Sequence, residues 1–113
     1  MDPTILVVDD EPAICTLLHR VLTRAGYRIQ EANDGLLALE MVAIERPALV
    51  LTDLMMPRMK GDELVARLMQ QPDPIPCILM SAFHSHPPIA TVPFLAKPFT
   101  MAGVMELVAE NLR

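Results

Sequence analysis

The chain has 113 residues, of which 52% are hydrophobic and 20% are charged, and its net charge is −5. This length and composition fit one compact domain with a core of its own, so we expect residues 1–113 to form a single domain. The negative charge, with lysines and arginines scattered along the chain, argues against nucleic acid as a direct partner, and no apolar run approaches the roughly 18 residues that span a bilayer.

The first strand and the first helix are marked by a change in the hydrophobic pattern. Ile5–Val8 is continuously apolar, which is typical of a strand covered on both faces, and the run stops at Asp9-Asp10. Pro12 suits the first turn of a helix, and Gly26 is the expected C-terminal cap. The apolar side of this helix repeats at spacings of three and four and comprises Ile14, Leu17, Leu18, Val21 and Leu22.

A weaker strand, a second helix and a third strand follow. We expect a strand at Tyr27–Glu31 and a turn at Asn33–Gly35 that leads into the helix. Pro47 ends this helix, and Ala48–Thr52 form a buried strand that stops at Asp53. The apolar residues of the second helix are Leu36, Leu39, Met41, Val42 and Ile44.

The second half of the chain contains two more helices and two more strands. Gly61 precedes a third helix, and a proline-rich connection leads from it to the strand Cys77–Met80. Val92–Ala96 is the last strand and ends at Lys97-Pro98. The apolar residues are Leu64, Val65, Leu68 and Met69 in the third helix, and Met101, Val104, Met105, Leu107 and Val108 in the final helix.

The cysteines and the N-terminus both indicate a cytoplasmic protein. Cys15 and Cys77 each lie in an apolar stretch, which favours two reduced core thiols over a disulfide. Met1-Asp2-Pro3 lacks the basic and apolar regions of a signal peptide. We therefore expect a protein of the cytoplasm that does not contact a membrane.

Short apolar strands that alternate with helices predict an α/β fold, a parallel sheet with helices on both faces. Right-handed crossovers make all strands run the same way, so their carboxyl ends meet at one edge, where α/β proteins bind ligands. The polar residues at these strand ends are Asp9, Asp10, Asp53, Ser81 and Lys97.

This group of side chains favours phosphoryl transfer assisted by a metal ion. Carboxylates gathered at one place repel one another and have raised pKa values unless a cation joins them. Mg²⁺ suits such a site because it binds one or two carboxylates and leaves positions for phosphate oxygens. An aspartate beside a cation and an ammonium group can itself act as the nucleophile and form an aspartyl-phosphate.

At this point the sequence resembles the receiver domains of bacterial two-component response regulators. The matching segments stand in the family's order over essentially the whole chain: Val8-Asp9-Asp10-Glu11-Pro12, Asp53-Leu54-Met55-Met56-Pro57 followed by Gly61, Met80-Ser81-Ala82, and Lys97-Pro98-Phe99. The resemblance implies a flavodoxin-like, doubly wound sheet of five parallel strands in the order 2-1-3-4-5.

The resemblance also implies a role for each acidic residue. Asp53 would be the phosphoacceptor, which takes its phosphoryl group from a sensor histidine kinase or a phosphotransfer protein. Asp10, Asp53 and the backbone carbonyl of Met55 would bind Mg²⁺, and Asp9 would act through a metal-bound water. Phosphorylation would then change the affinity for an output partner that the sequence does not identify.

The other positions that match the family would respond to the phosphoryl group. Lys97 would pair with the phosphoryl oxygens, and Ser81 would be the switch hydroxyl. Phe94 falls at the aromatic switch position, where many relatives carry tyrosine. The Lys97-Pro98 peptide would be cis.

The segment between Ser81 and Lys97 departs from the family. Lys97 follows Ser81 by 16 positions, several fewer than in typical receivers, and Pro87-Pro88 and Val92-Pro93 oppose a helix. We expect the fourth helix to be absent or reduced to a turn, replaced by an irregular, mobile loop. The output or dimerisation face that many receivers build there is therefore in doubt.

Two other functions remain open on the sequence alone. A Mg²⁺-dependent phosphohydrolase would use the same covalent aspartate, but such enzymes usually carry a second aspartate two residues later, where this chain has Met55. A degenerate receiver would bind its partner regardless of phosphorylation. The chain ends at Arg113, directly after the last predicted helix, which fits either a free-standing regulator or a fragment of a longer protein.

Single residues of the predicted site also allow simpler interpretations. Asp9-Asp10 could cap a helix, Ser81 could be an ordinary loop hydroxyl, and Lys97 could be a solvated surface charge. His84 and His86 have the spacing of a metal pair, but no further ligands lie near them in sequence, which favours a solvated loop. Only the meeting of several residues at one edge supports the site.

Overall fold

The structure is a computed structural model that describes residues 2–82, 89 and 91–112. The strands are β1 (Thr4–Val8), β2 (Arg28–Ala32), β3 (Leu49–Asp53), β4 (Cys77–Ser81) and β5 (Phe94–Ala96). The helices are α1 (Pro12–Arg24), α2 (Gly35–Ile44), α3 (Gly61–Met69) and α4 (Met101–Asn111). None of the helices in these described residues has the length and hydropathy of a membrane-spanning segment.

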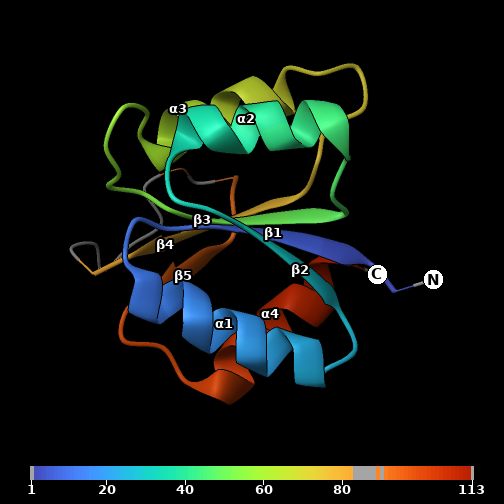
Figure 1. Ribbon diagram of the computed structural model, residues 1–113, viewed down its shortest axis with the longest axis vertical. Helices are drawn as coiled ribbons and strands as arrows, with labels where there is room; N and C mark the ends of the chain where they lie inside the picture. Colours follow the sequence, from blue (N-terminus) through green and yellow to red (C-terminus); the bar gives the residue numbers. More distant parts are fainter. Residues whose placement is uncertain (1, 83–88, 90, 113) are drawn as a thin grey trace.

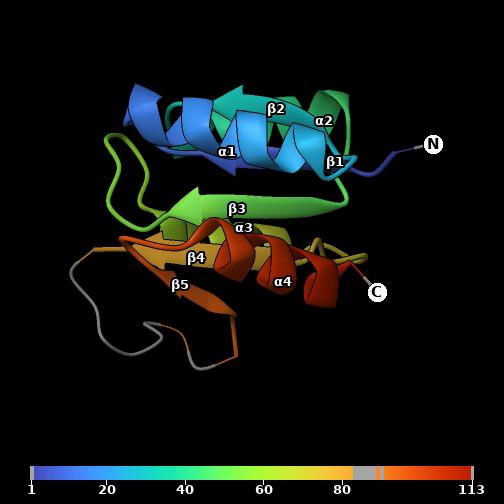
Figure 2. The same cartoon turned by 90° about the horizontal axis from the view of Figure 1, so that it is seen from below.

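The five strands form one parallel sheet in the order β2-β1-β3-β4-β5, which confirms the predicted fold. Helices α1 and α4 cover one face of the sheet, and α2 and α3 cover the other (Figure 1). The three central strands β1, β3 and β4 are buried along their whole length, as their continuous apolar runs predict. All strands end at the same edge (Figure 2).

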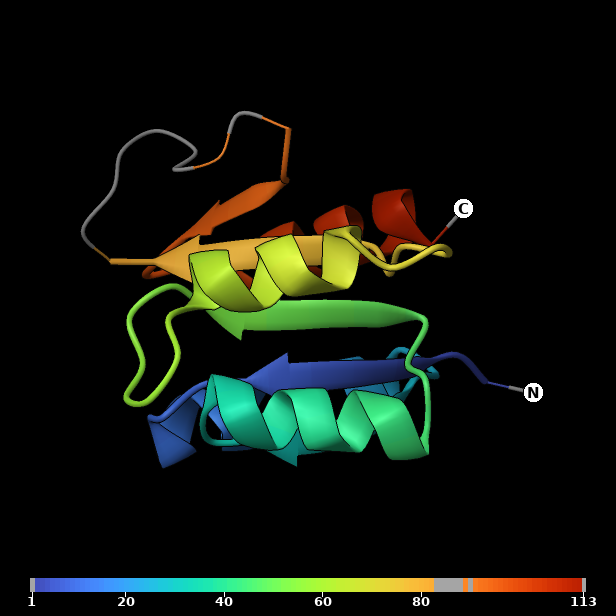
Figure 3. The same ribbon diagram turned by 90° about the horizontal axis from the view of Figure 1, so that it is seen from above.

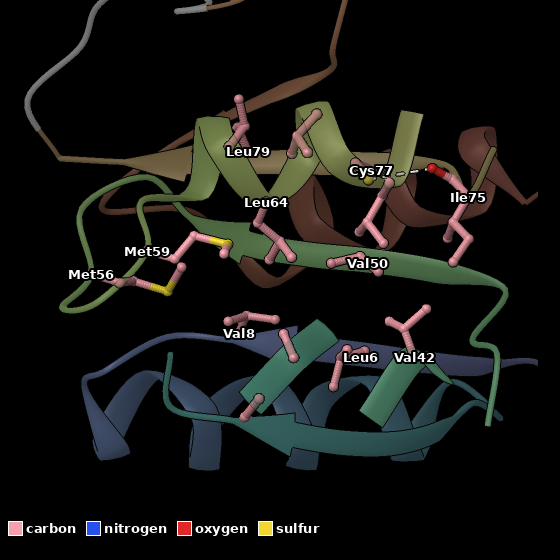
Figure 4. Close-up of a cluster of buried hydrophobic side chains, with 14 of the residues drawn as sticks. Leu6, Val8, Val42, Val50, Met56, Met59, Leu64, Ile75, Cys77 and Leu79 are labelled. Carbon is pink, nitrogen blue, oxygen red and sulfur yellow. Dashed lines mark hydrogen bonds between the residues drawn. The ribbon is translucent and has the colours of Figure 1, made fainter. Parts of the chain in front are cut away.

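Two apolar layers form the core, one on each face of the sheet. Figure 4 shows the layer beneath α2 and α3, where Val8 of β1 and Val50 of β3 lie among Val42, Leu64 and other buried side chains. The second layer packs beneath α1 and α4 and includes Cys15. Burial on both faces makes the sheet a rigid support for whatever its carboxyl edge carries.

Both cysteines are free and buried, so the prediction of two core thiols is confirmed. Burial raises the pKa of Cys15 to about 11 and that of Cys77 to about 12. Both thiols are therefore protonated near neutral pH and behave as small apolar groups.

The first helix begins and ends as its sequence indicates. Pro12 stands at the first helical position, and Gly26, just beyond the last turn, has a φ of +100°, which is the conformation expected of a glycine at a helix C-terminus. The predicted turn before α2 is also confirmed, because the Asp34 side chain accepts a hydrogen bond from the backbone N–H of Leu37 at 2.8 Å.

For some residues the prediction that they face the core is wrong. Ile44 is 86% exposed and Met101 is 57% exposed. The other residues predicted to face the core that are exposed are Leu17, Leu36, Met69 and Met105. In α2 almost every position is apolar, so the sequence pattern could not select the buried face. The side of α2 that faces the core carries the small residues Gly35 and Ala38 together with Val42.

The strand boundaries differ from the predicted ones by a residue or two, in a way that matters for the site. Asp53 and Ser81 are the last residues of β3 and β4 rather than the first residues after them, because they are still paired with Met80 and Ala96 of the next strand. Strand β5 is shorter than predicted and begins at Phe94.

The predicted loss of a fourth helix falls largely outside the described residues. The positions between β4 and β5 that the structure does describe, 82, 89 and 91–93, are not helical. Residues 83–88 and 90, and with them His84 and His86, lie outside the description. Four helices are present in the described part of the chain.

Candidate functional site

Four strand ends meet at the carboxyl edge of the sheet. Strand β1 leads directly to Asp9, and β3 and β4 end in Asp53 and Ser81. Strand β5 leads to Lys97, whose backbone N–H donates to the carbonyl of Ser81 at 3.0 Å. The residues that the sequence predicted for one edge are therefore brought together.

Lys97 lies at the centre of this group. Its Nζ donates to Asp9 Oδ2 at 2.8 Å and lies 3.1 Å from Asp53 Oδ1 and 3.3 Å from Glu11 Oε1. The Lys97 side chain is only 9% exposed, and those of Asp9 and Asp53 are 0% and 9% exposed. Lys97 is thus a buried cation that contacts three carboxylates, not a solvated surface charge.

The pKa values of the buried pair reflect this crowding. Burial and the nearby charge of Asp9 raise the pKa of Asp53 above its ordinary value, and the contact with Lys97 only partly opposes them. Burial also opposes the charge of Lys97, but Asp9 and Asp53 outweigh it and raise the pKa of the ammonium. Near neutral pH the ammonium is charged, and the negative charge around it is in excess.

The acidic residues fit a divalent cation. Asp9, Asp10 and Asp53 each offer a carboxylate oxygen, and these oxygens lie within 4.8 Å of one another. Carboxylate oxygens are the ligands that Mg²⁺ prefers, and a divalent cation would balance the excess negative charge. Asp10 is exposed and lines, with Asp9 and Glu31, a pocket of about 360 Å³ between the ends of β1 and β2, so solvent reaches the group on the side of Asp10.

Gly61 allows the chain to pass close to the end of β3. A Cβ atom on this residue would lie 2.1 Å from the backbone oxygen of Asp53, so any other residue would displace one of the two segments. The Gly61 N–H also donates to the Leu54 carbonyl at 2.8 Å. The loop from β3 to α3, which carries Met55, is therefore closed tightly at its base.

Two other predicted features lie in β5 and directly after it. Phe94, the first residue of β5, is half-buried and packs against the core layer beneath α2 and α3. The Lys97-Pro98 peptide is cis, as the resemblance implies.

The contact of Glu11 with Lys97 was not foreseen from the sequence. Glu11 stands directly after Asp9-Asp10, and this position was the available signal, but an exposed glutamate at the start of a helix has many simpler explanations. The Asp9 side chain accepts a hydrogen bond from the Glu11 N–H at 2.9 Å, which stabilises the turn between β1 and α1.

Nearly the whole chain is similar to one known family of domains. Residues 5–109 match the model of the response regulator receiver domain. The chain belongs to this family. The receiver is 36% identical over 115 residues to the response regulator MprA of Mycobacterium leprae and 34% identical over 118 residues to the sporulation initiation phosphotransferase F of Bacillus subtilis.

These relatives differ in how much of their length the receiver covers. The alignment with the M. leprae protein includes 96% of this chain and 50% of that protein. The alignment with the B. subtilis protein includes 99% of this chain and 95% of that protein. Solved receivers are also similar in structure: the chemotaxis response regulator CheY4 of Vibrio cholerae superposes with a TM-score of 0.90 at 25% identity, covering 99% of this chain and all of that one. The receiver domain of the hybrid histidine kinase CckA gives 0.84 at 28% identity, covering 97% and 99%.

Proposed function

We propose that this receiver is a phosphorylation-dependent switch in which Asp53 accepts a phosphoryl group from a phosphohistidine on a sensor kinase or a phosphotransfer protein. One observation carries the proposal: a buried carboxylate at a strand end lies 3.1 Å from a lysine ammonium and within reach of two further aspartates. That arrangement combines a nucleophile with the positive charge that phosphoryl transfer needs.

In the proposed reaction a carboxylate oxygen of Asp53 attacks the phosphorus atom. An O–P bond forms, the N–P bond to the donor histidine breaks, and its electron pair stays on the departing imidazole. Lys97 stays beside Asp53 and offsets the charge of the phosphoryl oxygens. Mg²⁺, held by Asp10, Asp53 and the carbonyl of Met55, with Asp9 acting through water, would supply further charge neutralisation.

Phosphorylation would change the balance of contacts around Lys97. The new group adds roughly −1.5 to −2 charges and three acceptor oxygens. Lys97 would shift from sharing three carboxylates toward the phosphoryl oxygens, and the Ser81 hydroxyl would donate to them. Ala96 pairs with Ser81 across the sheet, and Phe94 lies in the same short strand, β5. The shift would therefore reposition Phe94 and alter the affinity for an output partner.

The proposal also covers the setting of the protein. Residues 1–113 would act as one receiver domain in the cytoplasm, where ATP is available to sensor kinases. The output partner would be a protein and not nucleic acid or a membrane, consistent with the net charge of −5. The receiver would be a signalling domain that assists only its own phosphorylation and dephosphorylation.

The proposal is tested by intact-mass measurement after incubation with Mg²⁺ and acetyl phosphate. We expect a single, slowly decaying phosphoryl adduct on the wild type and none on Asp53→Asn. Asp73→Asn, which removes an exposed carboxylate before the start of β4, at the opposite end of that strand from Ser81, is the matched control and should form the adduct normally.

The other outcomes identify the alternative functions. Rapid turnover of phosphomonoesters would show a phosphohydrolase. No adduct on the wild type would show a receiver that works without phosphorylation. A Lys97→Ala variant should accept phosphate slowly but fail to switch partner affinity, and normal switching in that variant would contradict the role proposed for Lys97.

A further inference from the structure

The loop between β3 and α3 is tied at its tip to the start of α2. This loop, residues 54–60, carries Met55 and follows the phosphoacceptor candidate directly. Figure 3 shows it in green at the carboxyl edge of the sheet, on the same side as the beginning of α2. Its base is fixed by the hydrogen bonds Leu54 N–H to Met80 carbonyl at 2.9 Å and Gly61 N–H to Leu54 carbonyl at 2.8 Å.

Arg58 is the polar anchor of the loop tip. Its guanidinium donates through Nε at 3.0 Å and also through Nη2 to the same oxygen, Oδ2 of Asp34. Asp34 is buried, and its other oxygen caps α2 through the N–H of Leu37. The aspartate therefore holds the helix end with one oxygen and the loop with the other.

The backbone of Arg58 indicates that the loop is held in a specific conformation. Its φ is +67°, and no other non-glycine residue in the described part of the chain has a positive φ. Side chains with a Cβ rarely adopt this conformation, and such residues persist where surrounding contacts determine the backbone. The double contact to Asp34 is such a determinant.

A neighbouring apolar contact fixes the same segment. Met59 is buried, and its Cβ lies so close to Gly35 that a Cβ on the glycine would be 2.8 Å away. The loop tip is thus docked on the first residues of α2 by a charged contact at Arg58 and an apolar contact at Met59.

We infer that Asp34 and Arg58 are positioning residues that hold the β3–α3 loop in the shape in which the carbonyl of Met55 can join Asp10 and Asp53 around a divalent cation. This inference rests on the proposed function, because that function assigns the carbonyl to the metal. Neither residue touches the reacting atoms. Their effect is exerted through the backbone of four positions between Asp53 and Arg58.

The test is magnesium binding by titration calorimetry on variants that spare the local structure. Arg58→Asn removes the cation but keeps a residue that tolerates positive φ, and Asp34→Asn keeps a good helix cap but removes the charge. Loss of residues that orient metal ligands typically weakens affinity 10–100-fold, so each variant should bind Mg²⁺ roughly tenfold more weakly. Arg67→Asn, which breaks the exposed Arg67–Glu63 pair on α3, should bind as the wild type does.

Two further readouts separate positioning from simple stability. The double variant should bind no more weakly than either single variant, because both remove the same contact. In each single variant, the Mg²⁺ concentration that gives half the maximal rate of adduct formation with acetyl phosphate should be about ten times higher than in the wild type. The maximal rate itself should stay close to that of the wild type.

Unchanged magnesium affinity in both single variants, with only a lower melting temperature, would overturn the inference and leave the pair a structural contact. If the wild type itself takes up no Mg²⁺, the proposed function fails first and this inference fails with it. The wild-type titration therefore distinguishes the two failures.

Discussion

Lys97 is the residue on which the electrostatics of the site depend. It contacts Asp9, Asp53 and Glu11, so one ammonium offsets three carboxylates, two of which are buried with it. Taking a charge out of water costs several kcal/mol unless a partner of opposite sign is near. Removing Lys97 would leave Asp9 and Asp53 buried, close together and unpaired.

Replacing Lys97 by methionine, which keeps the length of the side chain, should therefore lower the free energy of unfolding by about 3–5 kcal/mol at pH 7 without Mg²⁺. Urea unfolding monitored by circular dichroism measures the loss. A second substitution, Asp9→Asn, should recover part of it by removing one of the unpaired charges. Lys60→Met, at an exposed lysine without an ion pair in the described part of the chain, is the control. A Lys97→Met protein as stable as that control would contradict this account.

At the scale of elements, two helices begin with different kinds of cap. The carboxylate of Asp34 caps α2, and the Thr100 hydroxyl caps α4 by accepting from the Gly103 N–H at 2.9 Å. The hydrogen bond from Leu37, and then the contact with Arg58, hold the pKa of Asp34 below its ordinary value of 3.8. The stability that Asp34 contributes is therefore complete above that value and is lost as pH falls through the lower pKa of the folded protein.

Substitution of each cap by alanine should separate the two mechanisms. Asp34→Ala should lower the free energy of unfolding by about 1–2 kcal/mol at neutral pH. This difference from the wild type should shrink below about pH 4 as the wild-type carboxyl is protonated. Thr100→Ala should cost about 1 kcal/mol at every pH, because a hydroxyl does not titrate there. Denaturant unfolding across that pH range measures both, and equal pH profiles would refute the charged role of Asp34.

The junction of β3 and α3 is the most constrained contact between elements near the site. Gly61→Ala would force a Cβ against the Asp53 carbonyl and should lower the free energy of unfolding by about 1–3 kcal/mol or more. Gly103→Ala is the matched control, since its Cβ would lie 3.0 Å from the Thr100 side chain only, and the helical preference of alanine offsets that contact. Thermal melts compare the two, and equal losses would argue against the close approach at Gly61.

At the scale of the whole molecule, the acidic edge should link magnesium to global stability. A ligand that binds only the folded state stabilises it by about 2.7 kcal/mol at one hundred times its dissociation constant. Mg²⁺ should therefore raise the melting temperature in a concentration-dependent manner, and chelation by EDTA should reverse the rise. Asp53→Asn should reduce the shift strongly, and an unchanged shift in that variant would place the metal elsewhere.

Local pattern was sufficient for much of this architecture. The buried strands, the α1 boundaries and the Asp34 turn follow from apolar runs, Pro12 and Gly26, because these features act within a few residues of one another. The buried face of α2 did not follow, because a helix that is apolar on all sides carries no periodic signal and packing against the sheet makes the choice.

The sequence by itself determined the alternation of strands and helices, and with it the arrival of Asp53, Ser81 and Lys97 at one edge, because parallel strands have their carboxyl ends at the same edge whatever their order. Only the tertiary structure decided that Lys97 contacts Glu11 as well as two aspartates, that Gly61 touches the end of β3, and that Arg58 reaches Asp34. These contacts join residues whose separation depends on exact backbone paths and side-chain directions, which hydrophobic pattern does not encode.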